Sequence, residues 1–308
     1  MMELIKNPKL NFIGARKVTY IFSILLVLNG LYAMYLIGAG KAKMGLDFTG
    51  GLSMQVQFSK DINTEQIRTI ISKNGFDQAV IQKMGTDADK IYLLRLGNRE
   101  LKGKVNPSAE IISILSKATG DTAINELETN EVGSLVSSQI KQKALMAVIW
   151  ALVGILVYIW IRFKFKFAVA ATIATLHDVL AVLGIMVLLG KEIDLLVITA
   201  LLTVAGYSLT DTVVVFDRIR ENMRQILKKT FTEVVNFSIN EVLSRTIVTS
   251  FTTLLVAVSL LVFGGNVLHT FSLAVTIGII IGTYSSDFLA APIITDWENF
   301  EAKNKNKN

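Results

Sequence analysis

Three acidic side chains lie inside long apolar stretches of the sequence, where a carboxyl group has few ordinary uses. They are Asp178, Asp211 and Asp287, and nearly every other Asp and Glu lies outside such stretches. An acid at the centre of a bilayer costs about 2.5–3.5 kcal/mol on insertion scales, so such groups normally face a protein interior or a water path. For Asp178 and Asp211 the sequence therefore favours a proton or ion relay. Asp287 would lie about 6 Å from the end of its stretch, which favours a structural role.

Arg245 opens a further apolar stretch and is followed by hydroxyl side chains, among them Thr249 and Thr253. An arginine and an acid at similar depth, with hydroxyls that can order water, are the parts of an ion relay. One hypothesis is that Arg245 pairs with ionised Asp211 and is released when this acid is protonated. Two static alternatives stay open, in which Arg245 is permanently paired with Asp211 or with Asp287.

His177, next to Asp178, could shuttle protons. Successive helical residues point about 100° apart, however, so packing explains this histidine equally well. The chain has no cysteine and two histidines, which argues against thiol chemistry and a multi-histidine metal site. It also lacks an ATP-binding or dinucleotide motif. We expect no enzymatic activity and no cofactor, with H⁺ or alternatively Na⁺ as the ion of the relay.

The elements that must position these residues are membrane-spanning helices. Hydrophobic residues make up 52% of the 308 positions and charged residues only 18%, which argues against an ordinary soluble enzyme and a disordered chain. A bilayer about 30 Å thick needs about 20 helical residues. Stretches of this kind are Val18–Gly38, Ala144–Ile161, Phe167–Leu189, Leu195–Phe216, Thr246–Phe263 and Val267–Ala291. They predict a polytopic α-helical membrane protein with six transmembrane helices.

The first stretch has a basic preamble, but it is longer than the apolar run of a signal peptide and no clean cleavage site follows, which favours a retained anchor. Lys and Arg gather in the N-terminal segment, at 162–166, at 217–245 and in the tail. This bias predicts that both termini are cytoplasmic. The net charge of +6 then reflects topology, and we expect no nucleic-acid partner. The predicted divisions are 1–39 (N-terminus and first helix), 40–143 (extracytoplasmic domain), 144–291 (five helices with a cytoplasmic loop at 217–245) and 292–308 (cytoplasmic tail).

Residues 40–143 read as a small α+β domain between the first and second helices. Strand-like alternation at Leu52–Phe58, Gln78–Met84, Lys90–Leu96 and Thr122–Glu128 is interleaved with two helical patterns, one opened by Asn63 and Gln66 as a capping box. The order β-α-β-β-α-β is that of a ferredoxin-like sandwich. Such folds host many functions, so contact with something outside the membrane and a merely structural cap are both open.

Three motifs in this chain resemble the SecD/SecF protein-export family. The segment Gly45-Leu46-Asp47-Phe48-Thr49-Gly50-Gly51 is similar to its G-x-D-F-x-G-G signature. The stretch Gly206–Asn222 resembles the fourth-span motif in the form of the SecF branch, and Leu243–Ser250 resembles the fifth-span motif. His177-Asp178 also fits, and the resemblance covers essentially the whole chain.

The resemblance implies half of an RND-like transporter in the bacterial inner membrane, paired with a SecD-like subunit. It implies further partners in the SecYEG channel, YajC and the unfolded polypeptide in transit, and a proton gradient that drives late export. It places functional roles at Asp211 and Arg245, whereas Asp287 departs from the pattern, since an apolar residue is expected there. A non-conducting structural subunit stays the alternative, and a drug or lipid exporter is disfavoured by the small outer domain.

The glycine motif has two interpretations. Gly45, Gly50 and Gly51 permit backbone conformations that other residues resist, so the residues alone indicate a tight connector between the first helix and the first strand. The resemblance implies in addition that this motif, with Asp47 and Phe48, acts as a hinge.

Overall fold

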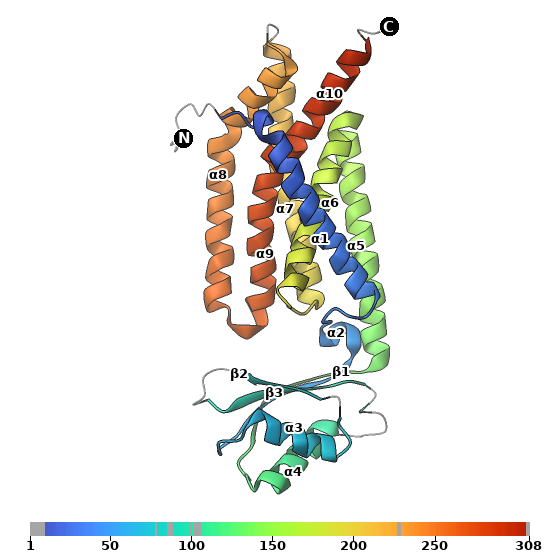
Figure 1. The fold of residues 1–308 in the computed structure, drawn as a ribbon, viewed down its shortest axis with the longest axis vertical. Helices are drawn as coiled ribbons and strands as arrows, with labels where there is room; N and C mark the ends of the chain where they lie inside the picture. The colour runs from blue at the N-terminus through green and yellow to red at the C-terminus, as the bar shows by residue number, and fades with distance from the viewer. Residues whose placement is uncertain are drawn as a thin grey trace. The chain divides into compact units, whose positions relative to one another are not determined.

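The computed structural model describes residues 10–77, 79–84, 89–98, 100–101, 106–226 and 229–305 (Figure 1). The chain divides into two compact units, which we call the helical unit (Met1–Lys43 with Ala147–Asn308) and the sheet unit (Met44–Met146). Each is considered by itself below.

Six helices in the described residues are long and apolar enough to cross a membrane, which confirms the predicted fold class. They are α1 (Arg16–Gly38), α5 (Ser134–Arg162), α6 (Phe165–Leu188), α7 (Leu195–Gln225), α8 (Phe231–Phe263) and α9 (Gly265–Ser285). The last continues without a break through the π-helical turn η2 (Ser286–Ala290) into α10 (Ala291–Lys305). A 3-10 turn, η1 (Ile13–Ala15), precedes α1.

Helices α7 and α8 are longer than predicted, so the segment 217–245, expected as a loop, is for the most part helical. The two extensions are held together by polar contacts. Arg218 donates from Nε and Nη2 to the carboxylate of Glu241, at 2.7 and 2.6 Å. Asn222 donates to Glu241 at 2.6 Å and to Ser238 at 3.0 Å. Hydropathy predicts only the apolar part of each helix. These polar contacts stabilise the parts of α7 and α8 that extend beyond it.

Glycines bring the helices of this unit into close contact at two crossings. A Cβ atom on Gly30 of α1 would lie 2.4 Å from the carbonyl oxygen of Leu180 in α6. A Cβ atom on Gly278 of α9 would lie 2.1 Å from a methyl carbon of Val204 in α7. Small residues at helix crossings let membrane helices pack backbone to backbone, so these positions fix how α6, α7 and α9 present their polar residues.

The sheet unit is a four-stranded antiparallel sheet with strand order β2-β3-β1-β4. Its elements are α2 (Leu46–Thr49), β1 (Gly51–Gln57), α3 (Thr64–Lys73), β2 (Val80–Met84), β3 (Ile91–Leu96), α4 (Pro107–Thr119) and β4 (Asn125–Val132). Helices α3 and α4 cover one face of the sheet (Figure 1). The order β-α-β-β-α-β and this strand arrangement confirm the ferredoxin-like prediction.

The core of this unit follows the predicted periodicities. Leu52, Met54 and Val56 occupy alternate positions of β1 and are fully buried in the core of the sheet unit. Ile67 and Ile71 of α3 pack into the same core. Each fully buried aliphatic side chain contributes about 1.5–3 kcal/mol to the stability of the fold relative to exposure. The small core therefore depends on both the strand alternation of β1 and the helical periodicity of α3.

Strand β4 begins at Asn125, three residues later than predicted, because Asp121 organises the preceding residues as a turn. Its Oδ2 accepts from the backbone N–H of Ser59 (2.8 Å) and of Lys60 (3.1 Å), and its Oδ1 accepts from Ala123 N–H at 3.1 Å. Burial of Asp121 works to raise its pKa, but the donors on Lys60, Ala123 and Ser59 outweigh burial and hold the pKa below its ordinary value.

We expect Asp121 to make the sheet unit sensitive to acid. Because the folded pKa is lowered, the stabilisation is present above the ordinary pKa and is lost as pH falls through the folded value. Asp121→Asn should weaken the unit at neutral pH, since its amide group would face N–H donors, and should flatten the acid dependence. Amide-exchange protection of α4 and β4 in the full chain measures both effects, with the exposed Asp61→Asn as control. An unchanged acid dependence in Asp121→Asn would show that another group is responsible.

Candidate functional site

Asp178 lies in the interior of the helical unit, where hydroxyl groups from two other helices bind it. Its side chain is fully buried. Oδ2 accepts a short hydrogen bond from Ser208 of α7 and one of 2.7 Å from Ser285 of α9. Oδ1 lies 2.8 Å from Nδ1 of the neighbouring His177. The carboxyl group therefore joins α6, α7 and α9.

Asp211, on the next helix, α7, also accepts hydrogen bonds from hydroxyl groups of two other elements. It is 9% exposed, Oδ1 accepts from Thr246 of α8 at 3.0 Å, and Oδ2 accepts from Ser286 of η2 at 2.6 Å. Ser285 and Ser286, which are consecutive, thus bind the two acids of α6 and α7. A shift of this segment would change the surroundings of both carboxyl groups at once.

Further hydroxyls extend this arrangement between α7, α8 and α9. Tyr207 donates to Ser250 at 3.0 Å, and Thr283 donates to the same Ser250 oxygen at 2.8 Å. We use the term polar network for Asp178, Asp211, Tyr207, Ser208, Thr246, Ser250, Thr283, Ser285 and Ser286. Four helices contribute residues to this network, and its hydrogen bonds connect one helix to another.

The hypothesis that Arg245 pairs with Asp211 is not met in this conformation. Within the described residues Arg245 is exposed and makes no ion pair with Asp211 or with Asp287. Its successor Thr246 faces Asp211, and neighbouring helical residues point about 100° apart, which turns Arg245 outward.

Thr249 and Thr253 also lie outside the polar network. Thr249 is exposed and Thr253 is half-buried, and their hydroxyls donate to carbonyls of their own helix, those of Arg245 (2.9 Å) and Thr249 (2.8 Å). The hydroxyls of α8 that do reach the network, from Thr246 and Ser250, lie one turn apart on one face. The sequence shows this spacing, but it does not show which face of α8 contacts α7.

His177 and Asp287 are both buried, with exposures of 2% and 3%. In the described part of the chain, Nε2 of His177 and Oδ1 of Asp287 lack a hydrogen-bond partner. His177 is brought to Asp178 by a contact within its own helix. The helix that carries Asp287 continues through η2 and α10 to Lys305 instead of ending near Ala291.

The glycine motif forms a tight turn in the sheet unit, from α2 into β1. Gly50 and Gly51 have φ angles of +64° and +126°, which side-chain-bearing residues rarely adopt. A Cβ atom on Gly51 would lie 2.1 Å from the carbonyl oxygen of Leu96. Asn98 donates to the carbonyl of Thr49 at 3.1 Å. Gly45 precedes α2 as its N-cap residue, and the half-buried Asp47 and Phe48 lie within it. The turn fixes where β1 starts; hinge motion stays a prediction.

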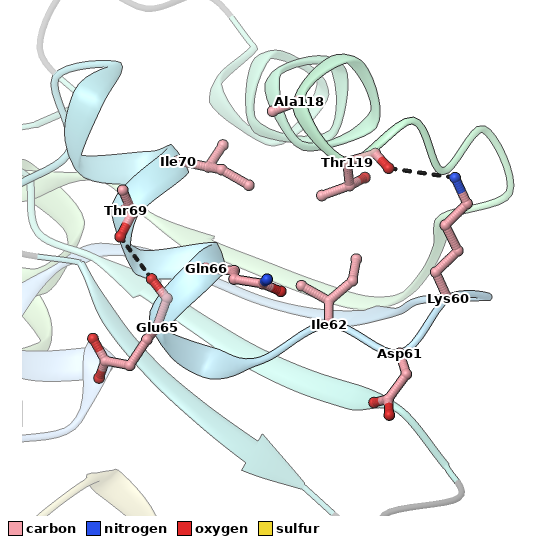
Figure 2. Close-up of a pocket in the computed structure, with 9 residues that line it drawn as sticks. All are labelled: Lys60, Asp61, Ile62, Glu65, Gln66, Thr69, Ile70, Ala118 and Thr119. Carbon is pink, nitrogen blue, oxygen red and sulfur yellow. Dashed lines mark hydrogen bonds between the residues drawn. The ribbon is translucent and has the colours of Figure 1, made fainter.

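The sheet unit also has an open groove between α3 and the end of α4 (Figure 2). Ile62, Ile70 and Ala118 supply its apolar lining. Its polar groups are engaged locally, since Lys60 donates to the carbonyls of Gly120 (2.6 Å) and Thr119 (3.4 Å). No acid–base pair converges there among the described residues, so the candidate site is the polar network of the helical unit.

Comparisons with known proteins show which family the chain is similar to. Residues 111–300 match the family described as protein export membrane protein SecD/SecF, C-terminal, and residues 36–62 match the SecD/SecF GG motif. The chain is 45% identical over 296 residues to the protein translocase subunit SecF of Thermodesulfovibrio yellowstonii, covering 96% of both. It is 38% identical over 289 residues to that of Rickettsia rickettsii, covering 94% of this chain and 92% of the relative.

Solved structures give the same result for the fold. The crystal structure of SecDF from Thermus thermophilus, a translocon-associated membrane protein, superposes with a TM-score of 0.82 at 34% identity. SecDF in its super-membrane-facing form gives 0.69 at 33% identity. These matches cover 95% and 100% of this chain but only 39% and 41% of the SecDF chains, so it spans about two fifths of their length. From its motifs, its fold and these relatives, the chain belongs to the SecD/SecF family of protein-export membrane proteins, among the translocase subunits named SecF.

Proposed function

We propose that this chain is one half of a SecD/SecF pair that uses inward proton movement to drive a late step of protein export. The observation that carries the proposal is the polar network, in which two buried acids on different helices are bound by the consecutive residues Ser285 and Ser286. A change in charge at Asp178 or Asp211 alters the contacts of this one segment. A local charge change that biases the packing of helices is a general basis for switching.

The energetics favour a gradient-driven cycle of small steps. One proton crossing the membrane supplies about 2.3 kcal/mol per 100 mV, so one or two protons match a modest helix rearrangement. The hydroxyls of Thr246 and Ser286 donate to Asp211. Such donors favour the ionised carboxylate, so a proton taken up by this buried acid can be released again. We take H⁺ as the coupling ion, with Na⁺ as the alternative outcome of the tests below.

The partners we propose are a SecD-like subunit, the SecYEG channel, YajC and an unfolded polypeptide in transit, in the lipid bilayer of the bacterial inner membrane. The SecDF relatives combine this part with a further part in one longer chain, which supports a separate SecD-like subunit here. Affinity purification of the tagged chain from its own membrane should recover that subunit with the channel. Recovery of the chain alone under mild extraction would contradict this assignment.

A second candidate function is a structural subunit that moves no ions. It is favoured by the fact that both carboxylate oxygens of Asp178 and of Asp211 are already hydrogen-bonded, as in a fixed contact. The two functions differ in whether a titratable group is needed at Asp211, because a structural contact tolerates asparagine.

We expect the sheet unit to face outward and both termini to face the cytoplasm. The chain has no cysteine, so single cysteines can be introduced at Lys73 of α3 and Lys303 of α10, both exposed. An impermeant maleimide should label Lys73→Cys in intact spheroplasts and Lys303→Cys only after the membrane is opened. The reverse pattern would invert the topology.

A further inference from the structure

Asp287 is a buried acid that the proposed relay does not use. It is 3% exposed, and Oδ1 has no hydrogen-bond partner among the described residues. The preceding residue, Ser286, donates to Asp211 at 2.6 Å, so the π-helical turn η2 brings Asp287 beside the polar network. The turn η2 packs against α7, the helix that carries Asp211. π-Helical turns within α-helices are frequent at functional sites.

Among the described residues, no cation of the elements packed against η2 pairs with Asp287. The helices against η2 are α1, α6, α7, α9 and α10. On α1, Arg16 pairs with Asp296 of α10 at 3.4 Å. On α6, Lys166 pairs at 2.9 and 2.5 Å with two glutamates of α10. Arg245 belongs to α8 and is exposed.

The uncharged titratable groups around η2 are also engaged elsewhere. Tyr20 of α1 donates to Asp296 at 3.0 Å, and Tyr284 of α9 donates to the carbonyl of Thr19 at 2.9 Å. His177 of α6 is bonded to Asp178. Asp211 of α7, another acid, is bonded to Ser286 of the same turn.

Two carboxylates in one buried site cannot both ionise cheaply. Each desolvated charge costs several kcal/mol, and like charges in a shared site favour retention of a proton by one of them. From this juxtaposition we propose that Asp287 is a second proton-binding group of the relay, and that Asp211 and Asp287 together hold one proton. The inference rests on the proposed function, and it adds a binding group at a position where the family resemblance predicts an apolar residue.

We take a proton and not Na⁺ as the ion of this pair, and the response to sodium chloride in the test below separates the two. The pair then has two states, with one proton and with two, and the change alters the charge beside Ser286.

Infrared difference spectroscopy tests the inference on the full chain with its SecD-like partner in lipid discs. At neutral pH the wild-type complex should show a protonated-carboxyl band that is lost or shifted in Asp287→Asn and kept in Asp296→Asn, the control on the same continuous helix. In Asp287→Asn, protonation of the remaining acid should move to lower pH by roughly one unit, because a neighbouring negative charge is gone. Asp287→Glu should restore the wild-type band and titration.

The readout is independent of export. An unaltered band and titration in Asp287→Asn would overturn the inference while leaving the proposed function standing. A band that responds to added sodium chloride and not to pH would overturn it in favour of a sodium site. Because Asp287→Asn could disturb packing, Asp287→Leu serves as a second variant; if it assembles and keeps the wild-type band, the inference is likewise wrong.

Discussion

Asp211→Asn should abolish the response of protein export to the proton gradient while the helical unit stays assembled. The asparagine amide can still accept from Thr246 and bond to Ser286, the two partners of Asp211, but it cannot take up or release a proton. Since Asp211 is not in an ion pair here, no opposite buried charge is left behind. We expect a stability cost of about 1–3 kcal/mol, that of weakening hydrogen bonds to a charged group.

Export into inverted membrane vesicles, with and without a gradient, measures this effect. The rate with Asp211→Asn should equal the wild-type rate after the gradient is collapsed, and Asp211→Glu should recover part of the response. The matched control is Asp217→Asn on the same helix, where the acid is 39% exposed and pairs with Arg162. A full gradient response in correctly assembled Asp211→Asn would favour the structural alternative.

Gly51→Ala should destabilise the sheet unit severely. The backbone of Gly51 has φ of +126°, and the added Cβ would lie 2.1 Å from the carbonyl oxygen of Leu96 in the neighbouring strand. Backbone strain of this kind costs about 1–3 kcal/mol, and the steric clash adds a similar amount. We expect a loss of about 2–4 kcal/mol of unfolding free energy, which is a large part of the stability of a small domain.

The measurement is thermal unfolding of the purified full chain, followed by limited proteolysis within residues 44–132. Gly97→Ala is a close control, because Gly97 follows β3 directly and a Cβ atom there meets nothing within 4 Å. Gly51→Ala should be cleaved at a lower temperature than both the wild type and Gly97→Ala. Equal cleavage of all three would show that the turn tolerates a side chain.

Much of the fold could be predicted because it depends on short-range patterns. Apolar length identifies the six helices, and strand alternation with two capped helices gives the ferredoxin-like sheet. The Asn63 cap, for example, is present: its backbone N–H donates to Oε1 of Gln66 at 3.2 Å, and its side-chain Oδ1 accepts from the backbone N–H of Glu65 at 3.3 Å. The burial of Asp178 and Asp211 follows from the free-energy cost of exposing an acid to lipid.

The rotation and length of each helix could not be read from the sequence in the same way. Hydroxyls surround much of α8, so packing against α7 decides that Thr246 faces the network while Arg245, Thr249 and Thr253 face outward. The helix that carries Asp287 extends past its predicted end because apolar composition ends before the helix does. The hydrogen bonds of Ser285 to Asp178 and of Ser286 to Asp211 depend on tertiary packing. The sequence shows only that the two serines are consecutive.

Proton flux tests the central claim most directly, namely that the buried acids of the polar network couple proton movement to export. The wild-type chain, reconstituted with its SecD-like partner and an exporting channel, would be compared with Asp211→Asn and Asp217→Asn, using a pH-sensitive dye on the side of the termini. The account predicts translocation-linked proton entry to that side in the wild type and in Asp217→Asn, and none in Asp211→Asn. Equal proton entry in the wild type and Asp211→Asn would contradict it.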